Sequence, residues 1–72
     1  MMQIKFTTVN GNPGCRKITL DNFVSEDGAT HLFRCNDGKG WYTRAVAVRK
    51  NPAAYIAWRV ARGSKAELIG TL

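Results

Sequence analysis

The stretch of residues 29–50 constrains the fold of this chain more than any other part of the sequence. Two β-rich runs flank Asp37-Gly38, and an Asp-Gly pair in that setting is a strong signal for a hairpin with a type I′ turn. With this pair at the tip, Arg34 faces Trp41 across the two strands. The predicted register therefore allows the Arg34 guanidinium to stack on the indole ring.

Further strands are predicted from alternating apolar residues and from turn-forming residues. They cover residues 2–9, 16–20 and 65–72, with turns over 10–14 and 25–28. In the second of these strands Ile18 and Leu20 are expected to point inward, because polar residues alternate with them. Phe23 and Val24 are expected to hold the following loop against the core.

Residues 52–62 fit a helix better than a strand. Asn51 is a good N-cap, Pro52 is favoured at the first helical position, and Gly63 is typical of the position just after a helix. The same stretch also alternates as a strand would, with Gly63-Ser64 as a hairpin turn. We expect the helix, because its three end signals agree with one amphipathic wheel.

The predicted helix has two contrasting faces. Its apolar face consists of Ala53, Ile56, Ala57, Val60 and Ala61. The opposite face consists of Tyr55, Arg59 and Arg62, with Trp58 at its edge. Because an amphipathic helix buries its apolar face, Ile56 and Val60 are expected to pack on the sheet.

Together these elements predict an α+β fold, a small antiparallel β-sheet of four to five strands with one short helix packed on it. A strand over residues 52–62 would instead give an all-β small barrel. At 72 residues the chain is expected to form a single basic domain, residues 1–72. A core of this size has little packing to spare for a deep pocket, which disfavours a small-molecule enzyme.

The positive charge is concentrated in the second part of the chain. Residues 1–30 hold three basic and three acidic residues, whereas residues 31–72 hold eight basic and two acidic ones. The whole formal net charge of +6 therefore belongs to the hairpin and to the residues after it. A basic domain of this kind favours binding to nucleic acid, to an acidic protein face or to an anionic membrane surface.

No catalytic, metal or cofactor site is predicted. The histidine of the chain, His31, faces Arg44 in the predicted register, and a neighbouring cation disfavours a protonated imidazole. Cys35 lies on the same strand but ~13 Å from His31, beyond the reach of a Cys–His pair. Cys15, His31 and Cys35 also lack the paired spacing of a structural zinc site. Thiol or zinc chemistry with these three residues is the third and remotest hypothesis.

The protein is expected to be cytoplasmic. Residues 1–5 do not resemble the apolar core of a signal peptide, and no apolar run approaches the ~20 residues of a membrane span. In that compartment Cys15 and Cys35 are expected as thiols. No membrane partner is predicted.

The mixture of cations with aromatic residues is the strongest functional signal in the sequence. Flat rings beside cations suit stacking on unpaired bases, and Trp, Tyr and Arg also dominate hot spots at protein interfaces. We expect these side chains to converge on one exposed patch. The predicted binding residues are Arg34, Lys39, Trp41, Arg44, Arg49, Lys50, Trp58, Arg59 and Arg62.

Two resemblances bear on the partner. The run Lys39-Gly40-Trp41-Tyr42 resembles the basic–Gly–aromatic start of the first RNA-binding motif in cold-shock domains, which are short β-barrels that bind single strands. In size, basic balance and lack of catalytic residues, the chain also resembles small, early-expressed bacteriophage regulators. The second resemblance implies a protein that binds host RNA polymerase.

We therefore expect a non-enzymatic regulator of transcription. Its basic, aromatic face would dock on an acidic surface of the transcription machinery, with RNA polymerase as the expected partner. Such a protein would inhibit by blocking or displacing another factor. The alternative is direct binding of single-stranded nucleic acid by the same residues in a cold-shock-like small β domain.

Overall fold

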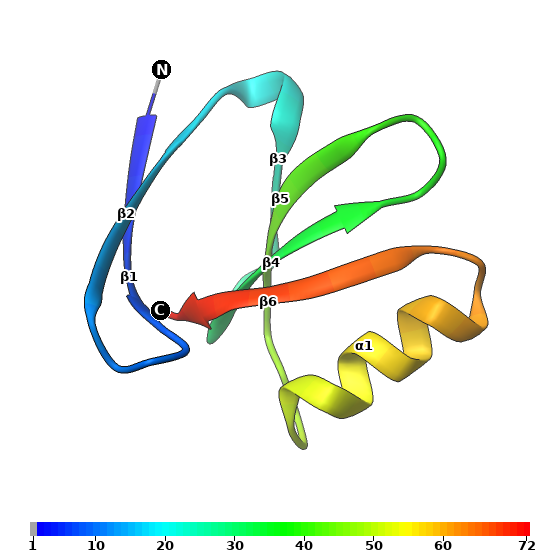
Figure 1. Ribbon diagram of the computed structural model, residues 1–72. Helices are drawn as coiled ribbons and strands as arrows, with labels where there is room; N and C mark the ends of the chain where they lie inside the picture. Colours follow the sequence, from blue (N-terminus) through cyan, green and yellow to red (C-terminus); the bar gives the residue numbers. More distant parts are fainter. Residues whose placement is uncertain (1) are drawn as a thin grey trace.

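A computed structural model of the protein describes residues 2–72, within which six strands form one curled sheet and one helix packs against it (Figure 1). In chain order the elements are β1 (Met2–Thr8), β2 (Pro13–Ile18), the 3-10 helix η1 (Leu20–Asn22), β3 (Phe23–Ser25), β4 (His31–Asn36), β5 (Trp41–Val46), α1 (Pro52–Ala61) and β6 (Lys65–Thr71). The strands lie in the order β2-β1-β6-β4-β5-β3. This mostly β architecture combines the short helix of the predicted α+β fold with the curvature of the small barrel that was its alternative.

The predicted count of four to five strands is wrong, because residues expected to form a loop form a sixth strand. β3 contains only three residues, Phe23–Ser25, and pairs with β5 in parallel. The other neighbouring strands of the described chain are antiparallel. Three residues are too few for an alternation to be recognised in a sequence, so this strand becomes visible only beside its partner.

The second strand lies earlier in the chain than predicted. β2 begins at Pro13 and ends at Ile18, whose side chain is buried as expected. Leu20, predicted to point inward, is 87% exposed. The chain leaves the sheet after Ile18 through η1, where the Asn22 N–H donates to the Thr19 carbonyl at 3.1 Å. This turn directs Leu20 away from the core.

The hairpin of β4 and β5 is confirmed, but its tip differs from the predicted type I′ turn. Asn36 pairs with Trp41, so the loop between them holds four residues. Positive φ angles occur at Gly38 (108°) and Gly40 (118°) and not at Asp37. The Asn36 side-chain oxygen accepts hydrogen bonds from the N–H groups of both glycines, at 2.8 and 3.3 Å, and so closes the loop.

The longer loop shifts the strand register by two residues. Trp41 now lies diagonally across from Arg34. A shift of two residues preserves which side chains share a face, because side chains alternate with a period of two. The predicted stacking of Arg34 on Trp41 is therefore confirmed, with the guanidinium carbon 4.0 Å from the ring centroid. His31, predicted to face Arg44, pairs with Val46 instead.

The two faces of the sheet have different surroundings. On the helix face, Phe33, Cys35 and Val46 form a buried cluster against α1. On the inner face, which the curl of the sheet encloses, Leu32 and Ala45 are buried. Alternate residues of the same strands thus serve two cores.

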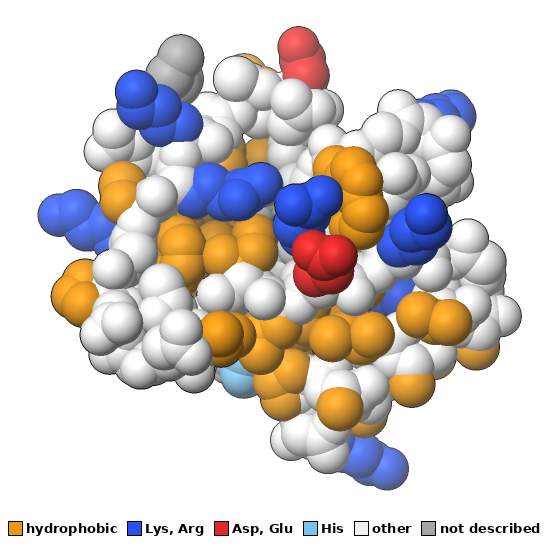
Figure 2. Space-filling view, in the orientation of Figure 1, with side chains coloured by type: hydrophobic (Ala, Val, Ile, Leu, Met, Phe, Trp, Pro, Cys, Tyr) orange, Lys and Arg blue, Asp and Glu red, His pale blue; other side chains and the backbone are white. Residues whose placement is uncertain are grey.

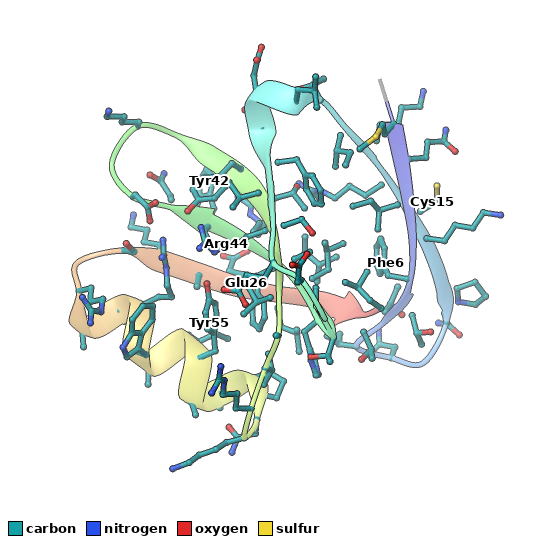
Figure 3. The ribbon with its side chains drawn as sticks, turned by 180° about the vertical axis from the view of Figure 1, so that it is seen from behind. Phe6, Cys15, Glu26, Tyr42, Arg44 and Tyr55 are labelled. Carbon is teal, nitrogen blue, oxygen red and sulfur yellow. The ribbon has the colours of Figure 1, made fainter. Side chains whose placement is uncertain are left out.

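β1 crosses β6 at a point where only glycine fits. Two residue pairs join these strands, Thr7 with Thr71 and Thr8 with Gly70. A Cβ atom on Gly70 would lie 2.1 Å from the Thr7 carbonyl oxygen and 2.8 Å from the Phe6 ring, which extends from β1 into the curl (Figure 3). Because this crossing joins β1 and β2 to the rest of the sheet, the curl of the sheet depends on it.

Both ends of α1 match the prediction, which confirms the helix. The Asn51 side chain accepts a hydrogen bond from the Ala54 N–H at 2.8 Å, and Pro52 takes the first helical position. Gly63 follows the helix with φ of 87°, and backbone hydrogen bonds of 3.0 Å close the last turn in a Schellman motif. Within residues 2–72 no helix is both long and apolar enough to cross a membrane.

Candidate functional site

The rotation of α1 about its own axis decides which side chains reach solvent, and it differs from the predicted rotation. Tyr55 and Arg59, predicted to lie opposite the packed face, are half-buried, while Val60 is 56% exposed. The Tyr55 ring packs 4.6 Å from that of Phe33. Burying a large ring contributes more than burying alanine methyl groups, so this aromatic pair outweighs the predicted apolar stripe.

Asp37 at the hairpin tip holds the C-terminal end of α1. Its carboxylate accepts hydrogen bonds from the Tyr42 and Ser64 hydroxyls, both at 2.7 Å, and pairs with the Arg59 guanidinium. These hydrogen bonds, first that from Tyr42, lower the pKa of Asp37 to about 2. The Arg59 side chain is only 11% exposed, so its charge is neutralised inside the protein rather than offered to a partner.

The outward face of α1 is apolar. It consists of Ala53, Ala54, Ala57, Trp58, Val60 and Ala61, all of which are exposed. Trp58 is 50% exposed, and the Arg62 guanidinium stacks over its ring at 4.3 Å from the centroid. Surface helices normally present charged residues to solvent, so an apolar outward face indicates a contact surface.

Cations lie at both ends of this outward face. Arg49 and Lys50 precede α1 and are exposed, and Arg62 follows it. Residues 38–66 contain seven Lys or Arg and no Asp or Glu. The surface therefore combines apolar contact area with a positive potential, which attracts anionic partners.

A second Arg–Trp stack lies on the inner face. Arg34, stacked on Trp41, also pairs with Glu67 at 3.4 Å. Beside it, Arg16 Nε donates across the curl to Thr43 Oγ1 at 2.9 Å. Figure 2 shows Lys and Arg side chains in a row across the middle of the view, with an acidic side chain beside them. The residues joined by the contacts of Arg34 and Arg16, namely Arg16, Arg34, Trp41, Thr43 and Glu67, are called the Arg34 cluster.

The predicted binding residues do not form one patch. They fall into three groups: Arg34 with Trp41 on the inner face, Arg49, Lys50, Trp58 and Arg62 around α1, and Lys39 and Arg44 of the hairpin with Arg59, which α1 directs to the hairpin tip. Trp41 and Trp58 are separated because the sheet lies between them. Trp41 shares the face of Leu32, whereas α1 packs on the opposite face.

The predicted binding residues lack six residues of these sites, Arg16, Asp37, Tyr42, Thr43, Ser64 and Glu67. The hairpin pattern identifies Asp37 only as a turn residue, and its partner Arg59 is 22 positions away. Arg16 belongs to the part of the chain without net charge. One signal is present in the sequence, because Asp37 and Glu67 are the two acidic residues of 31–72 and hence natural partners for its cations.

The residues considered for thiol or zinc chemistry have other surroundings. Among residues 2–72 no three His, Cys, Asp or Glu side chains are grouped so as to hold a metal ion. Cys35 is a buried free thiol, and burial raises its pKa, which disfavours the reactive thiolate. Cys15 is an exposed free thiol 3.5 Å from the Gln3 side-chain oxygen. His31 Nδ1 lies 2.8 Å from the Thr30 hydroxyl.

Comparison with known proteins gives no match. No protein-family model matches the chain, and no curated protein or solved structure matches it. The chemistry of its own surfaces is therefore the guide to its function.

Proposed function

We propose that this protein is a non-enzymatic regulator that docks the outward face of α1 on an acidic surface of a larger protein. The observation that carries the proposal is the exposed apolar face of the helix, with Trp58 and Val60 at its flanks. The protein acts by occupying the surface it binds, so that another factor is blocked or displaced.

The outward face offers the chemistry of an interface hot spot. Trp and Arg contribute most to such interfaces, and Trp58 beneath Arg62 supplies both. The alanines allow close approach, since helices that pack together lie ~8–10 Å apart according to the size of their contacting side chains. The stack also restrains the Trp58 ring before binding, which reduces the entropy lost on association.

The surrounding charges favour an acidic partner over a second copy of the chain. Two antiparallel copies packed through α1 would bring Lys50 of one near Arg62 of the other, and like charges across an interface are unfavourable. An acidic surface pairs with these cations and accelerates association.

The transcription machinery is the expected class of partner, and RNA polymerase is the first candidate. This expectation rests on the resemblance in size and basic balance to bacteriophage regulators. The geometry adds a requirement, an acidic surface with an apolar strip that accepts one face of a helix.

The experiment measures the affinity of RNA polymerase for the wild-type protein and two tryptophan variants. Trp58→Ala removes the ring from the outward face of α1, and loss of a hot-spot tryptophan weakens binding about 30-fold. Trp41→Ala removes the same side chain from the inner face and is the matched control. Its expected affinity stays within about twofold of wild type, because few interface residues contribute strongly and this one lies outside the interface.

Thermal unfolding of both variants shows that each is folded before its affinity is compared. Equal weakening by the two variants would contradict docking through α1. Failure of RNA polymerase to bind, with no stoichiometric protein partner recovered from lysate, would contradict the regulator as a whole.

Single-stranded nucleic acid is the second candidate, and the Arg34 cluster favours it. Trp41 is 38% exposed on a curved β surface beside two arginines, which suits stacking of an unpaired base. Nucleic acid ranks below a protein partner because the Glu67 carboxylate lies 3.4 Å from Arg34 and repels phosphates.

A salt series with single-stranded DNA and RNA tests this candidate. Nucleic-acid binding predicts a linear fall of log affinity with log salt concentration. Nucleic-acid binding also predicts the reverse order of affinities for the two variants, so that Trp41→Ala weakens binding and Trp58→Ala does not. The absence of binding at low salt would eliminate it.

A further inference from the structure

A cavity of about 400 Å³ lies at the edge of β5, beside residues that the short β3 does not reach. Its walls come from residues 21–24, the hairpin loop and the beginning of β5. The side chains that carry its chemistry are Asp21, Phe23, Lys39, Trp41 and Arg44. Figure 3, which shows the molecule from behind, has Arg44 between Tyr42 and Tyr55.

Arg44 carries a positive charge without an ion-pair partner in the described chain. Arg34 pairs with Glu67 and Arg59 with Asp37, but no ion pair within residues 2–72 involves Arg44. The Arg44 Nε is buried without a hydrogen-bond partner.

The polar groups around Arg44 do not supply the missing anion. They are the Tyr42 and Tyr55 hydroxyls and the Cys35 thiol, and burial raises the pKa of all three, so they are neutral at neutral pH. Asp37 lines the same cavity, but its oxygens already accept from Tyr42, Ser64 and Arg59.

A half-buried cation without a counter-ion is unfavourable, because the protein replaces its hydration only in part. A planar guanidinium is suited to bind two oxygens of one phosphate side by side. Lys39, on the loop that borders the cavity, adds a second positive charge. The cavity therefore lacks a negative group to pair with Arg44, and its cations suit a phosphate.

The remaining walls suit a flat, polar body. Phe23 and Trp41 line the cavity from the inner face of the sheet, where Arg34 covers one side of the Trp41 ring, and Asp21 can accept hydrogen bonds from hydroxyl or amino groups. The volume falls within the range of small-molecule sites, which begins at ~300 Å³. We propose that this cavity binds a nucleoside monophosphate across the free edge of β5, with its phosphate on Arg44 and Lys39 and its base against the rings on the other side of that edge.

The test is a titration of isotope-labelled protein with adenosine 5′-monophosphate, followed by NMR amide shifts and by calorimetry. Shifts are expected for residues 21–24 and 39–44. Inorganic phosphate is expected to bind more weakly at the same residues, and adenosine more weakly still, because each lacks half of the contacts.

Arg44→Gln is expected to weaken nucleotide binding about tenfold or more, since hydrogen bonds to charged groups are strong. It is expected to remain folded, because it removes an unpaired charge rather than half of an ion pair. Arg49→Gln is the matched control, since it removes an exposed cation outside the cavity and is expected to bind as wild type.

Trp58→Ala is also expected to bind the nucleotide as wild type, which separates this site from the docking face. Absence of binding at millimolar nucleotide would overturn the proposal. So would equal affinities of the Arg44→Gln and Arg49→Gln variants, shifts confined to other residues, or binding that requires an oligonucleotide.

Discussion

The two tryptophans of this protein are each covered by an arginine, yet the two pairs lie in opposite settings. Their local geometry is nearly the same, with Arg34 at 4.0 Å from Trp41 and Arg62 at 4.3 Å from Trp58. On the inner face Glu67 pairs with Arg34. Around Trp58 the exposed helix neighbours include Ala54, Ala57 and Ala61, and residues 38–66 contain no acidic residue.

This difference shows that a stacked Arg–Trp pair does not define a binding surface by itself. In the Arg34 cluster the charge is partly neutralised, and the hydrogen bond from Arg16 to Thr43 spans the curl beside the pair. On α1 the same two residue types border an exposed apolar face, and no ion pair within residues 2–72 involves Arg62. The acidic residue that lines the hollow beside Trp58, Glu26, accepts a hydrogen bond from the Ala47 N–H. The neighbours, rather than the pair, decide which surface remains free for a partner.

The largest effect is expected from a substitution at the strand crossing on which the curl of the sheet depends. Gly70→Ala places a Cβ atom against the Thr7 carbonyl, and we expect it to lower the free energy of unfolding by about 3 kcal/mol. Chemical denaturation measures this loss. Because the curl brings Arg16 to Thr43, the variant should disturb the Arg34 cluster more than α1.

Gly11→Ala controls for the loss of a glycine, because it lies in a turn with open space around it. It tests φ strain alone, and a smaller loss is expected. A Gly70→Ala protein as stable as wild type would show that the two parts of the sheet can separate without cost.

The next effect concerns the contact that sets the rotation of α1. Asp37→Ala leaves the Arg59 guanidinium and two hydroxyls without their acceptor, and we expect a loss of about 2 kcal/mol in the free energy of unfolding. Asp37→Asn keeps the shape and is expected to lose less. Unchanged stability in Asp37→Ala would mean that the packing of Tyr55 on Phe33 suffices to orient the helix.

The same contact predicts a pH dependence. Folding lowers the pKa of Asp37 from its ordinary value of 3.8 to about 2, so the folded state favours the charged carboxylate. Its stabilisation is complete above about pH 4 and is lost as the pH falls toward about 2. Acid unfolding of wild type and Asp37→Asn measures this, and the variant should be less sensitive in that range.

A smaller effect isolates charge on the outward face of α1. Ala57→Glu and Ala57→Lys place side chains of similar bulk at an exposed position, and both residues are good helix formers. Docking on an acidic surface predicts that the Glu variant binds at least about tenfold more weakly than the Lys variant. Equal affinities would show that the partner surface is not acidic.

The smallest effect is expected from a variant that gives the Arg34–Trp41 stack surroundings like those of the Arg62–Trp58 stack. Glu67→Gln removes the partner of Arg34, and because the pair is exposed we expect a stability change below about 0.5 kcal/mol. Affinity for single-stranded nucleic acid at low salt should rise, whereas docking through α1 should not change. A rise in protein docking instead would assign the partner to the inner face.

Local patterns predict the elements well, because their causes lie within a few residues of one another. The alternation over 2–9 gives β1, and the capping residues Asn51 and Gly63 mark the ends of α1. The stacking of Arg34 on Trp41 also follows from alternation, since a two-residue change in register does not alter the face.

The candidate site is predicted less well, because its arrangement depends on contacts between distant residues. The helical wheel favours burial of Val60, but Phe33 and Asp37 attract Tyr55 and Arg59 instead. That rotation keeps Ile56 on the core as predicted, turns the rest of the apolar stripe outward and removes Arg59 from the accessible cations. The sheet then separates Trp41 from Trp58, which composition alone cannot reveal.

The sequence alone specifies the strands and helix that have strong local signals, and it places all the net charge after residue 30. Folding in three dimensions establishes the parallel pairing of β3, the rotation of α1 and the division of the cations among three places. The physical reason is the separation along the chain over which each interaction acts. Caps and alternation act between neighbours in the chain, whereas ion pairs, ring packing and the Gly70 crossing act between residues that meet only after folding.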